Sequence, residues 1–166
     1  MAPARNIRPT ARHKLEKAQE REIVVVSDTA RGLVAGSTLL IPTPLDVDAI
    51  IREIPHGAVT TSAEIRKALA ARHGADAACP LCTGIFVRIS AEAAMEDEAG
   101  GRPDITPFWR VLAERGRLNP KLPGGVEEQA RRLRGEGFTI LPGTGKQPPQ
   151  VANFQATLFS PTKVGA

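Results

Sequence analysis

The sequence predicts a mainly helical fold with small β elements, arranged as a winged helix-turn-helix domain with a short N-terminal strand pair and a C-terminal hairpin. The first observation is a succession of segments with apolar residues at helical spacing, punctuated by glycine and proline. The second is a pair of helices that follows a turn at residues 55–57. The third is a pair of strand-like segments around a glycine- and proline-rich loop. Helix, helix, helix and then a hairpin is the order of a winged helix.

The composition fits one compact domain with appendages. The chain has 166 residues, of which 42% are hydrophobic and 24% charged, so a core can form and wholesale disorder is excluded. Aromatic residues make up only 4%, which argues against a surface that binds single strands through rows of stacked rings. We divide the chain into a flexible basic arm (1–21), a short strand pair and linker (22–44), a winged-helix domain (45–141), and a loop, last strand and tail (142–166).

The first segments are expected to form the arm and the strand pair. Residues 1–22 are basic and polar with two prolines, which is typical of a flexible segment, and a short helix is predicted near its end over residues 11–21. The β-branched run 22–27 and the apolar run 37–41 are predicted to pair as strands. A helix over 46–54 follows, because its apolar residues recur at helical spacing.

The predicted helix-turn-helix pair begins with a capping box. The Thr61 hydroxyl and the Glu64 carboxylate would satisfy two backbone amides at the start of a helix over residues 62–72. A glycine ends that helix, and Pro80 is placed as a first-turn proline for a second helix over residues 81–99. The connection between the two helices is longer than the usual tight turn.

The elements after this pair complete the winged arrangement. We expect a short strand and turn over 109–118, a helix over 126–134, a strand over 138–141, a loop over 142–150 and a last strand over 151–159. The two final strands are predicted to pair with each other.

The charge distribution indicates where a polyanion would bind. The net charge is +4, a mild preference for polyanionic partners. Residues 1–44 and residues 102–137 each carry +3, whereas residues 83–100 hold one basic residue, Arg88, against four acidic ones. Any DNA-facing part of the helix over 81–99 must therefore be its N-terminal half, and its acidic C-terminal half is expected to face water.

The sequence contains no apolar stretch long enough to span a membrane and no signal-peptide pattern, so we expect a cytoplasmic protein without a membrane partner. Cys79 and Cys82 are then expected to be thiols. Their spacing makes them weak candidates for a metal site or a redox pair, although one pair does not make a tetrahedral site. The alternative is a cysteine on the buried side of the helix start. No cofactor is expected.

Three segments, in order, carry a resemblance to a known family. Residues 54–61 read Ile-Pro-His-Gly-Ala-Val-Thr-Thr, residues 107–111 read Pro-Phe-Trp-Arg-Val, and Gly124-Gly125 leads to Gly135-Glu136-Gly137. Together they resemble the C-terminal DNA-binding domain of the alkylguanine-DNA alkyltransferases and of their non-reactive relatives, the alkyltransferase-like proteins. The resemblance covers residues 45–141.

The resemblance implies a non-enzymatic DNA-binding protein that senses alkylated or damaged bases for repair. Its partners would be double-stranded DNA, plain or alkylated, and a repair protein. Arg88 would enter the base stack from the minor groove and flip a base. Thr61, Ser62 and Arg110 would handle DNA, with Arg110 also tying the pocket segment to neighbouring carbonyl groups.

The base pocket that the resemblance implies consists of Pro107, Phe108 and Trp109. Phe108 stands where the family has its nucleophilic cysteine, and Trp109 stands where it has the activating histidine. A phenyl ring has no lone pair to accept an alkyl group, so alkyl transfer at this position is excluded. Ser62 occupies the position of the family's phosphate-rotating tyrosine and is a much shorter donor.

Three alternatives stay open at this point. In the first, Phe108 and Trp109 are core residues, the pocket is closed, and the domain binds protein or nucleic acid unspecifically. In the second, Arg88 only forms an ion pair with Glu92, four residues later in the same helix. In the third, the protein is an enzyme that uses one of its two cysteines as a nucleophile. A cavity beside Phe108 and Trp109 would argue against the first.

Overall fold

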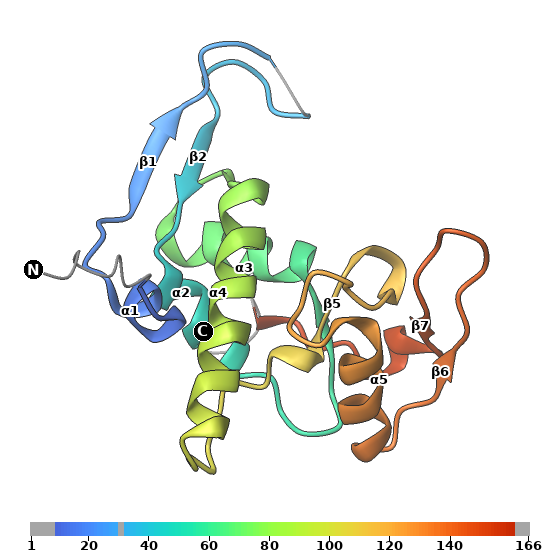
Figure 1. The fold of residues 1–166 in the computed structure, drawn as a ribbon. Helices are drawn as coiled ribbons and strands as arrows, with labels where there is room; N and C mark the ends of the chain where they lie inside the picture. The colour runs from blue at the N-terminus through green and yellow to red at the C-terminus, as the bar shows by residue number, and fades with distance from the viewer. Residues whose placement is uncertain (1–8, 30–31, 162–166) are drawn as a thin grey trace, which may run out of the picture.

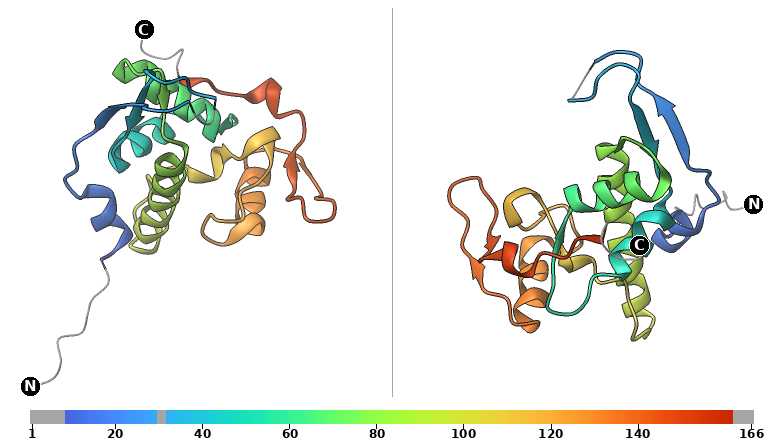
Figure 2. Two further views of the ribbon diagram at one scale, coloured as in Figure 1. Left: turned by 90° about the horizontal axis from the view of Figure 1, so that it is seen from above. Right: turned by 180° about the vertical axis from the view of Figure 1, so that it is seen from behind.

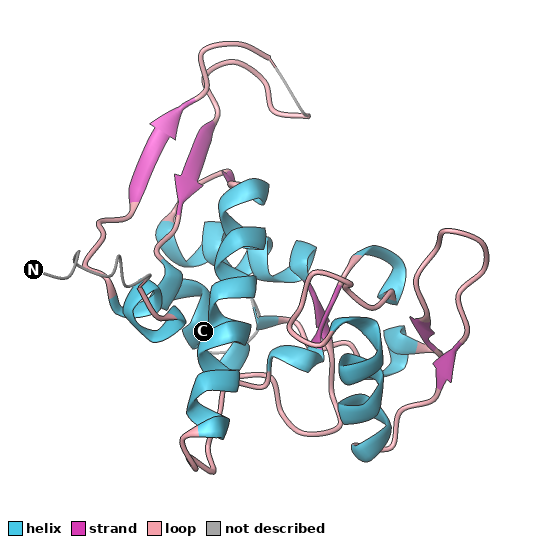
Figure 3. Cartoon of the chain, in the orientation of Figure 1, coloured by secondary structure: helices cyan, strands magenta, loops and turns pink. Residues whose placement is uncertain are grey.

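The computed structural model describes residues 9–29 and 32–161. Figures 1 and 3 show a mostly helical body from which a long β-ribbon projects at one end and a short hairpin at the other. The predicted mainly helical fold with small β elements and a winged helix-turn-helix order is confirmed. Its elements are α2 (Pro44–Arg52), α3 (Ser62–His73), α4 (Pro80–Ala99) and α5 (Gly125–Gly135), followed by a hairpin of β6 (Ile140–Leu141) and β7 (Gln150–Val151).

The segment predicted as a flexible arm is partly a docked helix. Residues 1–8 of the predicted arm lie outside the described residues. Helix α1 (Ala11–Glu16) buries Leu15 against α4, and the Glu96 carboxylate accepts from the amides of Ala11 and Arg12 at 2.8 and 3.0 Å. Figure 2 shows α1 beside α4 in both views. The prediction of a flexible arm is therefore wrong for α1, because one buried leucine and an anion at the helix start fix it to the body.

The predicted strand pair is confirmed and gains a third strand. β1 (Glu22–Val25) pairs antiparallel with β2 (Thr38–Ile41), and β2 also pairs in parallel with the two-residue β4 (Ala77–Ala78) in the connection between α3 and α4. This extra strand explains why the connection is longer than a tight turn. Every residue of β1 is exposed, so the ribbon projects from the body in Figure 1.

The helix starts follow the expected caps with one change. Thr61 caps α3, and its hydroxyl accepts from the Glu64 amide at 3.2 Å. The Glu64 carboxylate, however, accepts from Lys67 and Ser160 instead of returning to the cap, so the predicted capping box is only half formed. The complete capping box lies at the start of α2, between Thr43 and Asp46. The Glu64 carboxylate therefore binds side chains outside the first turn instead of the backbone amide of the cap residue.

The middle segment forms two short parallel strands and two 3-10 turns. β3 (Thr60–Thr61) pairs with β5 (Val111–Leu112), which is shorter than the strand predicted from residue 109. The residues before β5 form a 3-10 turn, η1 (Phe108–Arg110), and those after it form η2 (Glu114–Gly116). This pairing brings the start of α3 next to the segment that carries the two aromatic residues.

The predicted last strand over 151–159 is mostly wrong. Strand structure ends at Val151, Asn153 takes a left-handed conformation with φ of 52°, and residues Phe154–Thr157 form the 3-10 helix η3. Asn adopts this conformation more readily than most residues, which ends the strand after two residues. The predicted pairing of the two final strands is confirmed as the β6–β7 hairpin.

The core is divided into two clusters that meet at the aromatic segment. The larger cluster joins α2, α3 and α4 around Phe108, and the smaller one joins α5 to β5 and β7. Trp109 packs against both clusters. None of the helices in the described part of the chain is long and apolar enough to cross a membrane.

The acidic half of α4 does not simply face water, as the charge pattern predicted. Asp97 is buried and pairs with Arg12 of α1, and Glu98 accepts from Arg132 of α5 at 2.7 Å. Glu96 caps α1, as described above. Glu96 and Glu98 are exposed, so the prediction is wrong only for Asp97, because it counted charges along one helix and not their partners on others.

Candidate nucleic-acid interface

The 3-10 turn η1 separates the two rings that the sequence placed together. Phe108 is fully buried in the larger core cluster, whereas Trp109 is half-buried. The rings meet edge to face, with centroids 5.4 Å apart and an interplanar angle of 81°. Phe108 therefore packs against the Trp109 ring from the core and does not line a pocket. Its predicted role as a pocket residue is wrong, and the core interpretation holds for this ring alone.

The carboxylate of Glu136, at the end of α5, fixes this segment. It accepts from the Trp109 indole Nε1, from Arg110 Nε at 3.0 Å and from the Gly57 amide at 2.9 Å. Arg110 also donates from Nη1 to the Ile54 carbonyl at 2.7 Å. Burial disfavours the charged carboxylate, but these donors outweigh it and lower the pKa of Glu136 below its usual value. The network joins the turn before α3, η1 and α5.

Arg110 acts as the structural bridge that the sequence analysis described. Its side chain is only 13% exposed, and its guanidinium is engaged by Glu136 and the Ile54 carbonyl. The bridge uses the Nε and Nη1 atoms of this guanidinium. The structure thus favours positioning over DNA contact for Arg110.

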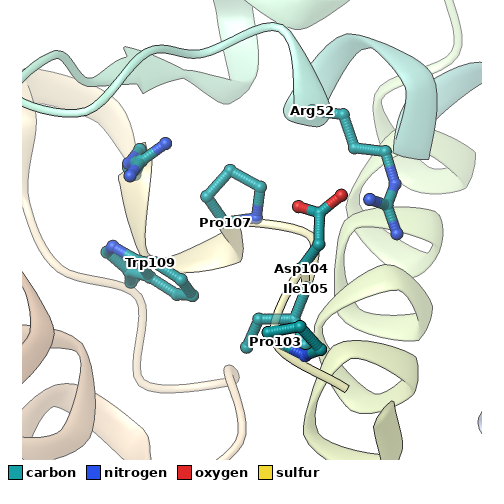
Figure 4. Close-up of a pocket in the computed structure, with 7 residues that line it drawn as sticks. Arg52, Pro103, Asp104, Ile105, Pro107 and Trp109 are labelled. Atoms are coloured by element: carbon teal, nitrogen blue, oxygen red, sulfur yellow. The ribbon is translucent and has the colours of Figure 1, made fainter. Parts of the chain in front are cut away.

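A cavity of about 450 Å³ opens beside Trp109. Figure 4 shows Arg52 reaching in from the end of α2 and Trp109 facing it across the hollow, with Asp104 between them. Pro107 also lines the cavity, as predicted, but Phe108 does not. The presence of this cavity beside the half-buried Trp109 argues against a closed pocket. The lining residues are Arg52, Pro103, Asp104, Ile105, Pro107, Trp109 and Arg110.

A second hollow of about 340 Å³ runs along the N-terminal half of α4. We call it the α4 groove; its lining residues are Pro80, Leu81, Gly84, Ile85, Arg88, Ala113, Asn119 and Lys121. Leu81 and Ile85 are 68% and 44% exposed, and Arg88 and Lys121 are exposed beside them. Arg88 Nε lies 3.5 Å from Glu92 Oε1, so the predicted intrahelical pair is present as well. Both side chains of the pair are exposed, so water screens it and leaves Arg88 free to move.

Thr61 and Ser62 lie at the start of α3. The Thr61 side chain is buried and already accepts a backbone amide, so the structure assigns it a capping role. Ser62 is half-buried at the first position of the helix, and the N-terminus of a helix is a place where backbone amides can bind an anion. The structure brings neither residue into the lining of the cavity or of the α4 groove.

Cys79 and Cys82 lie at the start of α4 and line neither of the two hollows described above. Both are free and half-buried, and the Cys79 sulfur accepts from the Cys82 amide at 3.4 Å as the helix cap. Within residues 9–29 and 32–161, no group of three or more metal-binding side chains comes together.

Sequence reasoning missed three residues that shape the site. Gln129 is fully buried; its amide donates to the carbonyls of Trp109 and Val111, and its oxygen accepts from the Asn119 amide at 2.7 Å. Arg132 places its guanidinium 4.9 Å from the Trp109 ring centroid. Glu136 is the third. A glutamine inside an amphipathic helix, with apolar neighbours one turn away on either side, was the signal available for Gln129.

Similarity to known proteins is found among solved structures. No protein-family model matches the chain, and no curated protein does. Among solved structures the chain is similar to S. pombe Atl1, in a complex with damaged DNA containing O6-carboxymethylguanine. The match has 22% sequence identity and a TM-score of 0.48, and it covers 70% of this chain and 93% of that one. The likeness is one of fold.

Proposed function

We propose that this protein binds double-stranded DNA through the α4 groove and senses damaged bases without chemistry of its own. The observation that carries the proposal is the pair of exposed cations, Arg88 and Lys121, beside exposed apolar side chains on the second helix of a helix-turn-helix. Cations attract the phosphate backbone, and apolar side chains can enter between base steps in the minor groove. Contact with water does not favour the exposure of apolar side chains such as Leu81 and Ile85. Their position next to two cations therefore indicates a binding surface.

The Trp109 cavity supports recognition of an extruded base. A base that stacks on an aromatic ring gains about 1–3 kcal/mol, and Trp109 offers the largest ring in the chain. Arg132 on the ring and Glu136 on the indole nitrogen hold Trp109 in place, so it is ordered before any ligand arrives. The cavity and the α4 groove share no lining residue. DNA binding and lesion preference are therefore tested by separate variants.

The absence of alkyl transfer rests on the residues near the cavity. Phe108 has no nucleophilic atom and lies in the core. Neither Cys79 nor Cys82 lines the cavity. Incubation with alkylated DNA should leave the intact mass of the protein unchanged. An added alkyl group on either cysteine would overturn the non-enzymatic part of the proposal. A repair-protein partner and a cytoplasmic location stay predictions of the sequence.

The first experiment tests DNA binding through the groove. Arg88→Ala should weaken binding to a duplex and reduce the slope of log affinity against log salt by about 0.9, the value for one phosphate contact. The matched control is Glu92→Gln, which removes the partner of Arg88 but keeps the cation. It should bind at least as well as wild type. Equal binding by Arg88→Ala and wild type would show that Arg88 serves only the ion pair.

The second experiment tests lesion recognition. Trp109 is the single tryptophan, so its fluorescence reports directly on the cavity. Titration with a duplex that contains an O6-alkylguanine should quench the emission more strongly, and at lower concentration, than the same duplex with guanine. Trp109→Phe keeps a ring and should retain most of the preference in an anisotropy assay, whereas Trp109→Ala should lose it. Identical affinities of wild type for both duplexes would refute damage sensing while leaving DNA binding intact.

A further inference from the structure

The start of α4 holds two cysteines that are linked by a contact between one sulfur and the backbone amide of the other. Cys79 is the N-cap residue and Cys82 lies three positions later, in the first helical turn. The Cys79 sulfur accepts from the Cys82 amide at 3.4 Å. Cys82 Sγ is three covalent bonds from the amide nitrogen that contacts Cys79. A rotation of the Cys82 side chain can therefore bring the two sulfurs to bonding distance without unfolding the helix.

Both thiols are half-buried, but only that of Cys79 lines a cavity. Cys79 lines a mostly apolar cavity of about 350 Å³ between the β-ribbon and the helix-turn-helix, and Cys82 does not. Burial, the hydrogen bond to Cys79 and the charge of Cys79 raise the pKa of Cys82 to about 11. A thiol attacks a disulfide as its thiolate, and it must reach the reagent. Access and protonation together make Cys79 the attacking thiol and Cys82 the second one.

A cation lines the same cavity as Cys79. Arg66 of α3 lines it, and no ion pair or side-chain hydrogen bond of Arg66 is found among the residues that the structure describes. Most other arginines near the core of this chain have a carboxylate partner. An unpaired guanidinium beside a reachable sulfur fits a small disulfide that carries carboxylate groups. Figure 1 shows this region where the lower end of the β1–β2 ribbon meets the start of α4.

We propose that Cys79 and Cys82 form a thiol–disulfide exchange site that reacts with small anionic disulfides of the glutathione class. The Cys79 thiolate attacks one sulfur of the disulfide, the S–S bond breaks, and one thiolate leaves and takes up a proton from water. Cys82 then loses its proton to water and attacks the Cys79 sulfur of the mixed disulfide, which expels the second thiol. Two protein thiols are oxidised to one disulfide, and one small disulfide is reduced to two thiols. This proposal does not depend on DNA binding.

The roles of the two cysteines are tested by intact-mass and peptide mass spectrometry after reaction of the reduced protein with glutathione disulfide. Wild type should lose two hydrogen atoms and yield a Cys79–Cys82 cross-linked peptide. Cys82→Ser should accumulate one glutathione on Cys79, and Cys79→Ser should stay unmodified over the same time. Serine is a favourable cap, so Cys79→Ser preserves the start of α4. Equal modification of the two variants, or a wild type that never closes the disulfide, would overturn the proposal.

The role of Arg66 is tested by the charge of the reagent. The measured quantity is the rate of reaction with glutathione disulfide divided by the rate with the cationic disulfide cystamine. This ratio should be higher for wild type than for a free cysteine peptide. Arg66→Gln should reduce that preference by roughly fivefold, the effect of one solvent-exposed ion pair. Lys67→Gln is the matched control, because it removes the same charge from the neighbouring residue, which is outside this cavity. Equal losses in the two variants would refute recognition by Arg66.

Discussion

Replacement of Glu136 by glutamine should destabilise the folded protein, because it weakens the hydrogen bonds that hold the Trp109 segment. The carboxylate, whose side chain is 7% exposed, receives donors from Trp109, Arg110 and Gly57. A glutamine amide keeps one acceptor oxygen and turns its NH₂ group toward donors. Hydrogen bonds to charged groups contribute about 1.5–3 kcal/mol each, and an ion pair that loses one buried partner costs about 3–5 kcal/mol. Because one acceptor survives, we expect the free energy of unfolding to fall by about 3 kcal/mol.

Urea unfolding followed by the fluorescence of Trp109 measures this change. The midpoint should fall while the slope stays constant, and the native emission should move to longer wavelength as the indole loses its partner. The control is Glu92→Gln, which breaks an exposed ion pair and should cost less than about 0.5 kcal/mol. A Glu136→Gln protein as stable as this control would refute the reasoning.

The same residue gives a pH dependence with a defined sign. The folded protein lowers the pKa of Glu136 below its ordinary value of 4.5, so its contribution to stability is complete above that value. The contribution is lost as the pH falls through the lower pKa of the folded state. Wild type and Glu136→Gln should therefore converge in stability in acid and differ most near neutral pH.

Three further predictions concern the scaffold. Leu15→Ala should lower the free energy of unfolding by about 2–4 kcal/mol in a calorimetric or urea measurement, because Leu15 is 1% exposed and anchors α1; a loss below about 0.5 kcal/mol would mean that α1 is not docked. Gly116→Ala should cost more than about 1 kcal/mol, since Gly116 has φ of 73° and a Cβ there would overlap the Phe154 ring; an unchanged melting temperature would contradict this. Burial opposes ionisation of Asp46, yet hydrogen bonds from Arg21 and Thr43 lower its pKa to about 2, so Asp46→Asn should remove stability at pH 7 and have little effect near pH 2.

Local signals predicted most of the elements but not their partners. Caps, proline positions and helical spacing were enough to place α2 to α5 and the β1–β2 pair within a few residues. The docking of α1 was missed because it depends on Glu96 and Asp97, which lie about eighty residues further along the chain. The 3-10 helix η3 was missed for a different, local reason. Strand propensity after Val151 yields to a turn at Asn153 that the alternating pattern does not reveal.

The 3-10 turn η1 shows the same limit, because its local sequence signals did not reveal the partners of its three side chains. Phe108, Trp109 and Arg110 are consecutive, and a 3-10 turn has three residues per turn, so neighbouring side chains point about 120° apart. Only one of the three can face the core cluster of α2 and α4. Phe108 has no polar atom and takes that direction, whereas Trp109 carries an N–H that needs an acceptor and Arg110 carries a charge. Glu136 satisfies both of these groups from α5, and the Trp109 ring is left to form the cavity wall. Once the turn was known, the sequence alone could assign the three roles. A strand was predicted from Trp109 onward, however, and a strand would have placed Trp109 and Val111 on the same face.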